Sequence, residues 1–161
     1  SSLKEITINS NRKELDWKIF KNCSALEVIT IPKTITEIAE EAFCGCTNLQ
    51  KIKFEENSQL KKIGNNAFEN CDNLSKIVLP ENVESVGEKA FYHCDLLEDV
   101  RLNNKLNSLS SNVFCSCKNL KKDLHLFVMA LLEIVMSYKK LYYQRLCRKL
   151  VWKLFIIVTR L

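Results

Sequence analysis

The sequence is poor in the residues on which flexible loops, phosphate-binding turns and acid–base sites depend. Its 161 residues include 3 glycines, 2 prolines and 2 histidines. Glycine-rich phosphate-binding loops need two or three glycines each, so the scarcity of glycine excludes most nucleotide sites of that kind. The two histidines, His93 and His125, have no Cys, Asp or Ser partner at the spacing of a catalytic motif. We therefore expect no enzymatic activity and no cofactor.

Charge is unevenly distributed along the chain. The formal net charge is +5, but residues 1–120 carry 15 basic and 17 acidic side chains, whereas residues 121–161 carry 9 and 2. All 15 asparagines also lie at or before Asn119. We therefore expect a boundary near Leu120, between a slightly acidic N-terminal domain and a strongly basic tail.

Three apolar columns recur with one common spacing and define five repeats. In each repeat a phenylalanine is followed by a cysteine three residues later, and the leucine three residues after that cysteine comes directly after the end of the repeat. The columns are Phe20, Phe43, Phe68, Phe91 and Phe114; Cys23, Cys46, Cys71, Cys94 and Cys117; and Leu26, Leu49, Leu74, Leu97 and Leu120. The repeats span 3–25, 26–48, 49–73, 74–96 and 97–119. Because a unit of about 23 residues cannot bury its apolar side alone, the repeats are expected to stack.

Each repeat has the same internal order. It begins with the alternation of a half-buried strand, as in Ile29 and Ile31, and continues with a second short apolar pair, such as Ile35 and Ile38. The closing Ala-Phe-x-x-Cys-x-x-Leu segment has the i, i+3 spacing of a single helical turn. These patterns predict an α/β solenoid over 3–120. It would have a continuous parallel sheet on one face, short helical turns, and the Phe and Cys columns stacked as internal ladders.

The whole pattern resembles a known repeat. Leu-x-x-Ile-x-Ile-Pro followed by Ile-x-x-Ala-Phe-x-x-Cys-x-x-Leu is similar to the leucine-rich repeat of the BspA-like subclass, and the segments 26–49 and 74–97 match it best. The resemblance covers residues 3–120. It implies a leucine-rich repeat arc, and a cell-surface protein that binds host or matrix proteins. The tail from Lys121 has no counterpart in the motif.

The repeat accounts for most of the eight cysteines. We expect the five cysteines of the column to be free thiols, buried as small apolar side chains. Neighbouring members lie close enough for a disulfide, but a continuous column offers no unique pairing. The pairs Cys44/Cys46 and Cys115/Cys117 belong to coils too far apart to share a metal ion, so no metal site is expected. Cys44 and Cys115 are the expected surface thiols.

The outward side of the predicted strands is the candidate partner-binding face. If Ile29 and Ile31 point inward, their neighbours point outward, and the alternation carries this to every coil. One outward column is Glu5, Val28, Lys51, Lys76 and Asp99, and the other is Thr7, Thr30, Lys53, Val78 and Arg101. Solenoids bind protein partners along such a face. Without aromatic anchors, the columns are equally consistent with an ordinary solvated surface, and they give no support to nucleic-acid binding.

Residues 121–161 predict a helical tail. Apolar residues recur at helical spacing over 124–136, and residues 139–161 combine basic and apolar side chains as in an amphipathic helix. Four interpretations stay open: a cap over the end of the solenoid, a membrane-surface anchor, a short spanning anchor that its length disfavours, and a segment read in a shifted frame.

The sequence therefore predicts a non-enzymatic protein-binding or adhesion module that acts as a cell-surface or extracellular antigen. The alternatives are a cytoplasmic leucine-rich repeat scaffold and a protein associated with a membrane through residues 121–161. No signal peptide is recognisable, and the chain begins with Ser1 rather than methionine. We therefore expect a fragment or a processed chain.

Overall fold

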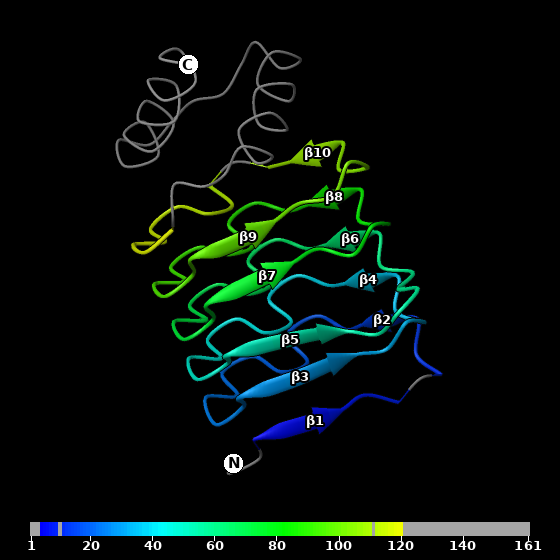
Figure 1. Cartoon of the computed structure of the whole chain (residues 1–161). Coiled ribbons are helices and arrows are strands. Elements are labelled where there is room, and N and C mark those ends of the chain that lie inside the picture. The colour runs from blue at the N-terminus through cyan, green and yellow to red at the C-terminus, as the bar shows by residue number, and fades with distance from the viewer. Residues whose placement is uncertain (1–3, 10, 111, 121–161) are drawn as a thin grey trace, which may run out of the picture.

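The computed structural model describes residues 4–9, 11–110 and 112–120, which form a parallel β-solenoid of five coils (Figure 1). Each coil contributes a longer and a shorter strand. The longer strands are β1 (Glu5–Thr7), β3 (Val28–Ile31), β5 (Lys51–Phe54), β7 (Lys76–Val78) and β9 (Asp99–Arg101). The shorter strands are β2 (Glu14–Leu15), β4 (Glu37–Ile38), β6 (Lys62–Ile63), β8 (Ser85–Val86) and β10 (Ser108–Leu109). Each sequence repeat thus forms one coil of the solenoid.

The shorter strands form one uninterrupted parallel sheet. Its order is β10-β8-β6-β4-β2, and equivalent residues of successive repeats are paired, as Leu15 is with Ile38 and Ile63 with Val86. The second apolar pair of each repeat therefore builds a sheet of its own. The solenoid has strands on two sides and turns on the third.

The longer strands form two sheets rather than the predicted continuous one. β1, β3 and β5 pair in parallel, and so do β7 and β9, but no pairing joins β5 to β7. Figure 1 shows β5 nearly level while β7 and β9 rise across the view. The expectation of an unbroken sheet is therefore wrong at this junction. The break follows the 49–73 repeat, which carries two extra residues.

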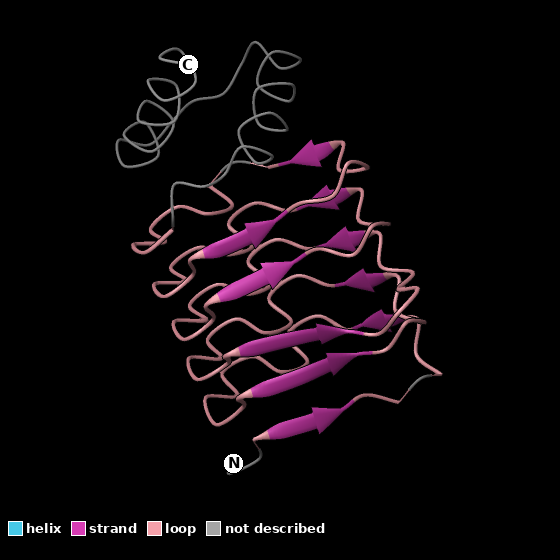
Figure 2. Cartoon of the chain, in the orientation of Figure 1, coloured by secondary structure: helices cyan, strands magenta, loops and turns pink. Residues whose placement is uncertain are grey.

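The closing segment of each coil consists of turns, and the predicted helical turns are absent from the described residues (Figure 2). Two residues per coil, one two positions before the phenylalanine and one two positions after it, have positive φ values between 51° and 76°. These are Lys18, Glu41, Asn66, Lys89 and Asn112, and then Asn22, Gly45, Asn70, His93 and Ser116. A left-handed residue ends a right-handed helical run, so the solenoid is built from strands and turns rather than from α and β elements.

The turns are held by backbone hydrogen bonds between coils as well as by i→i−3 bonds within each coil. The backbone N–H of Phe43 donates to the carbonyl of Ala67, and that of Phe68 to the carbonyl of Ala90, each at 2.8 Å. Each N–H therefore bonds to the following coil. Backbone polar groups of the turn side are satisfied in the same way as those of a sheet.

The phenylalanine column is the spine of the core, as predicted. Successive rings stack with centroids 5.1–5.4 Å apart, and the rings of Phe43, Phe68 and Phe91 are fully buried. The column therefore links all five coils through their shared interior.

The cysteine column is a ladder of free thiols, and from Cys46 onward each sulfur contacts a carbonyl oxygen of the preceding coil. The Sγ atoms of Cys71 and Cys94 lie 3.4 and 3.2 Å from the carbonyl oxygens of Phe43 and Phe68 in the preceding coils. The Cys46 and Cys117 thiols repeat this contact with Phe20 and Phe91. Thiols are weak hydrogen-bond donors, so cysteine combines small apolar volume with a donor for a buried carbonyl.

Cys44 and Cys115 are not surface thiols, contrary to expectation. Their exposed fractions are 8% and 6%. The Cys44 sulfur lies 4.0 Å from a carboxylate oxygen of Glu69, which belongs to the next coil. Stacking thus buries positions that a single repeat would leave open.

Candidate protein-binding face

The structure places the ten predicted residues in register along the longer strands. Glu5, Val28 and Lys51 are paired in one row of adjacent positions, and Thr7, Thr30 and Lys53 in the other. Lys76 is paired with Asp99, and Val78 with Arg101. The two outward columns therefore exist, divided between β5 and β7 by the break in the sheet. We define these ten residues as the strand face.

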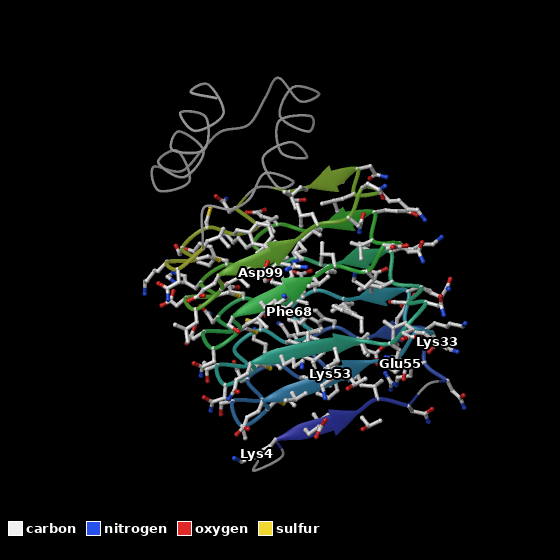
Figure 3. The ribbon with its side chains drawn as sticks, in the orientation of Figure 1. Lys4, Lys33, Lys53, Glu55, Phe68 and Asp99 are labelled. Atoms are coloured by element: carbon white, nitrogen blue, oxygen red, sulfur yellow. The ribbon has the colours of Figure 1, made fainter. Side chains whose placement is uncertain are left out.

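The strand face points outward, as the alternation predicts. The intervening Ile29 and Ile31 are fully buried, whereas Lys51 and Lys53 are exposed. Figure 3 shows Lys53 and Asp99 on the same side of the solenoid, along the longer strands. Val78 is 46% exposed and supplies an apolar surface among these charges.

Asp99 is held between two cations at one end of the strand face. The Lys76 Nζ atom lies 2.7 Å from its carboxylate, and the Arg101 Nε atom lies 3.5 Å from it. The hydrogen bond from Lys76 lowers the pKa of Asp99, and the charge of Arg101 acts in the same direction. Lys76, Arg101 and Asp99 together carry a net charge of +1, so Asp99 offsets one of the two positive charges at this end of the face.

The basic centre of the face has fewer available cations than the sequence suggests. Lys53 Nζ reaches back across two coils to within 3.8 Å of a Glu5 carboxylate oxygen, and Lys76 is occupied by Asp99. Lys51, exposed on β5, makes no ion pair with any residue that the structure describes. Lys51 is consequently the cation that a partner can reach without displacing an existing pair.

Two surface features away from the strand face were not singled out from the sequence. Trp17, after β2, is 61% exposed, and the Lys18 Nζ atom lies 3.9 Å above its ring centre. On the turn side, Glu41 pairs with Lys18 and Lys21. The hydrogen bond from Lys21 is the main cause that lowers the pKa of Glu41. The only sequence signal for the tryptophan is an aromatic residue in a column otherwise occupied by Glu40, Asn65, Glu88 and Ser111.

No arrangement for catalysis or metal binding is found among the described residues. Within them, no group of three or more His, Cys, Asp or Glu side chains could hold a metal ion. His93 lies 3.8 Å from Asp95, but the neighbouring Cys94 thiol is fully buried, and burial raises its pKa well above the usual range. The thiolate that a nucleophilic site requires is therefore disfavoured at Cys94.

The burial of the ladder predicts which thiols alkylating reagents can reach. Burial raises the pKa of Cys46 to about 12 and that of Cys71 still more clearly, whereas Cys23 is partly exposed. In the folded chain at pH 8, iodoacetamide should modify Cys71 and Cys94 at least about 100-fold more slowly than Cys23. Peptide mapping by mass spectrometry measures these rates. Equal rates in the folded chain would contradict the buried ladder, and denaturant provides the control because it should make all of them reactive.

The residues 121–161, and with them the predicted helical tail and its four interpretations, lie outside the described part of the chain. Where the structure does describe the chain, no helix has the length and apolar character needed to cross a membrane.

The stacked coils, the Phe spine and the outward strand columns define a leucine-rich repeat solenoid. The family model for the BspA type leucine rich repeat region, with six copies, matches residues 1–121, and the chain belongs to this family. The resemblance drawn from the repeat motif is thereby confirmed. Members of this repeat family are typically non-enzymatic.

Three solved structures are similar to the solenoid. A leucine rich repeat protein of T. pallidum is 29% identical, with a TM-score of 0.70 over 74% of this chain and 57% of that one. A leucine-rich repeat protein from Bacteroides ovatus is 37% identical, with a TM-score of 0.66 over 73% and 30%. A leucine rich cell surface protein from Faecalibacterium prausnitzii, 23% identical with a TM-score of 0.51 over 75% and 47%, shares the fold. The chain thus spans 57% or less of each, and no curated protein matches it.

Proposed function

We propose that the chain is a non-enzymatic protein-binding or adhesion module at a cell surface, and that the strand face contacts its protein partner. Membership of the BspA-type family supports this proposal, because repeat solenoids present extended surfaces to other proteins. The similarity to a leucine rich cell surface protein favours the surface location over a cytoplasmic scaffold.

The observation that carries the proposal is the alignment of the outward columns on rigid strands. Lys51, Lys53 and Arg101 are exposed, whereas Val100 is buried and Ile52 is partly buried against the core. Charged groups fixed in register favour a partner with complementary charge and accelerate its association. The exposed Val78 adds an apolar contact beside Arg101.

Reversing the charge of the basic centre should weaken partner binding. We expect the triple variant Lys51→Glu, Lys53→Glu and Lys76→Glu to bind at least about 10-fold more weakly, a loss of roughly 1.4 kcal/mol. Saturable binding of the full chain to a coated panel of purified extracellular-matrix proteins provides the measurement.

The matched control places the same charge change outside the strand face. Lys13, Lys33 and Lys61 are exposed and form no ion pair among the described residues, so changing all three to glutamate alters net charge equally. This control should bind like the unmodified chain, and circular dichroism should show that both variants fold. Equal binding by the first triple variant would reject the strand face, and equal losses in both would reduce the effect to overall charge.

A further inference from the structure

We propose that the break between β5 and β7 binds the carboxylate of an extended, acidic segment of the protein partner. This inference rests on the proposed function and deepens it, because it names the place on the strand face and the chemistry of the segment that is recognised there.

Two backbone donors are left without their usual acceptor at this break. In the second coil the N–H groups of Glu27 and Val28 both donate to the Lys4 carbonyl, at 2.8 and 3.1 Å. The same paired contact recurs from Gln50 and Lys51 to Glu27, and from Glu98 and Asp99 to Ser75. The matching groups at the break are the N–H donors of Ser75 and Lys76 and the carbonyl of Gln50. No backbone hydrogen bond joins them in the described structure.

The break is confined to the strand side of this junction. The rings of Phe68 and Phe91 remain stacked at 5.2 Å, β6 remains paired with β8, and the N–H of Asn73 still donates to the Thr47 carbonyl at 3.2 Å. The coils are therefore held together behind the break. Strand donors without a backbone acceptor are a template for another extended chain.

The geometry of the other coils indicates what the two donors can hold. Each equivalent pair of N–H groups converges on a single carbonyl oxygen of the neighbouring coil. Ser75 and Lys76 are both exposed residues, and in the proposed complex an oxygen from outside the chain takes that place. A carboxylate oxygen suits it well, since hydrogen bonds to charged acceptors are about twice as strong as those between neutral groups.

The side chains around the break favour an acid. Of the four outward positions on β5 and β7, three are occupied by Lys51, Lys53 and Lys76, and the fourth by Val78. The acidic groups facing these lysines are Glu5, at 3.8 Å from Lys53, and Asp99, at 2.7 Å from Lys76. Lys51 keeps its charge available. An incoming carboxylate would therefore meet one unpaired cation and could share Lys76 with Asp99.

The exposed Val78 extends the expected motif of the partner. Val78 follows Lys76 by two residues on the same side of β7. An extended segment lying along β7 would place an acidic side chain near Ser75 and Lys76, and a residue two positions further along over Val78. We therefore expect the segment to read acidic-x-apolar.

A peptide of alternating character tests the inference directly. The probe is a fluorescein-labelled nonapeptide, Thr-Glu-Thr-Val-Thr-Glu-Thr-Val-Thr, and its control is the same peptide with glutamine for glutamate. We expect the glutamate peptide to bind the full chain saturably, as measured by fluorescence anisotropy. The glutamine peptide should bind at least about 10-fold more weakly.

Two variants of the chain test the role of the unpaired lysine. Lys51→Glu, which breaks no ion pair, should weaken binding of the glutamate peptide by at least about 10-fold. Its matched control, Lys61→Glu on the other side of the coil, should leave binding unchanged. Equal binding of the two peptides, or equal losses in the two variants, would overturn the inference.

Amide hydrogen exchange locates the contact independently of affinity. In the free chain the N–H groups of Ser75 and Lys76 should exchange at least about 10-fold faster than those of Gln50 and Lys51, because only the latter are hydrogen bonded. A saturating amount of the glutamate peptide should slow the exchange of the Ser75 and Lys76 amides by a similar factor.

The matrix-protein partner separates this inference from the proposed function. The triple lysine variant can lose binding to that partner while the partner, bound to the unmodified chain, leaves the Ser75 and Lys76 amides unprotected. In that case the strand face is the binding surface, but the break is not the place where the partner docks. If the partner protects neither these amides nor any other of the strand face, both proposals fail together.

Discussion

Replacing Phe68 with alanine should lower the free energy of unfolding by about 3–5 kcal/mol. Phe68 is fully buried and lies between Phe43 and Phe91, with ring centroids 5.1 and 5.2 Å away. Its removal leaves a cavity in the middle of the spine and takes away two stacking contacts. Because each coil contacts only its neighbours, both interfaces of the third coil lose stability.

Urea denaturation followed by circular dichroism measures this loss, and the same substitution at Phe20 is its control. Phe20 is partly exposed and, among the described residues, stacks on one ring only, Phe43. The Phe20→Ala variant should therefore lose less than half as much stability. A leucine at position 68 separates burial from stacking, and should cost less than about 1.5 kcal/mol if burial dominates. Equal losses for Phe68→Ala and Phe20→Ala would contradict the role of the spine.

The core could be read from the sequence because each core position recurs in every coil. One apolar residue such as Phe43 carries little information by itself, but its recurrence fixes the coil length, the stacking and the burial of the whole column. The outward columns followed from the same periodicity, because side chains alternate across a strand. Register in this fold is thus set by sequence spacing.

The turns could not be read in this way. The left-handed positions hold Lys18, Glu41, Lys89 and His93 as well as asparagines, and charged residues give no sign of a positive φ. Only Gly45 and the asparagines favour that conformation. The i, i+3 spacing of Phe and Cys therefore predicted a helical turn, when the spacing in fact serves two stacked ladders.

The break in the strand sheet was not predicted, although the longer 49–73 repeat marks its position. It coincides with the two-residue insertion before β6 and with Phe54, which occupies the inward column where Ile31 and Leu79 are buried but remains only partly buried itself. Lys51 and Lys76 also occupy equivalent positions of the two repeats, and like charges at facing positions disfavour pairing. Several weak local effects coincide there, and the repeat spacing registers only the insertion. Nor does the sequence tell which lysine is left without an acidic partner.

The second large effect is expected from adding one methyl group at Gly64. A Cβ atom on this residue would lie 2.6 Å from the backbone nitrogen of Glu40 and 2.7 Å from the carbonyl carbon of Ala39 in the preceding coil. Backbone atoms cannot move away as a flexible side chain can, and the Gly64 N–H is itself bonded to the Ile38 carbonyl at 2.8 Å. We expect Gly64→Ala to lower the free energy of unfolding by about 1–3 kcal/mol through overpacking between coils.

The contrast with Gly45 tests whether the close approach of two coils, rather than glycine as such, is what matters. Gly45 has a φ of +76°, but the equivalent positions hold Asn22 and Asn70 with φ values of 60° and 56°. The nearest atom to an added Cβ there is the side-chain oxygen of Asn22, which is exposed and can rotate away. Gly45→Asn should therefore change stability by less than about 1 kcal/mol. Thermal unfolding of the Gly45→Asn and Gly64→Ala variants measures the two losses of stability. A loss for Gly45→Asn as large as that for Gly64→Ala would mean that these glycines are needed for their backbone conformation and not for the close spacing of the coils.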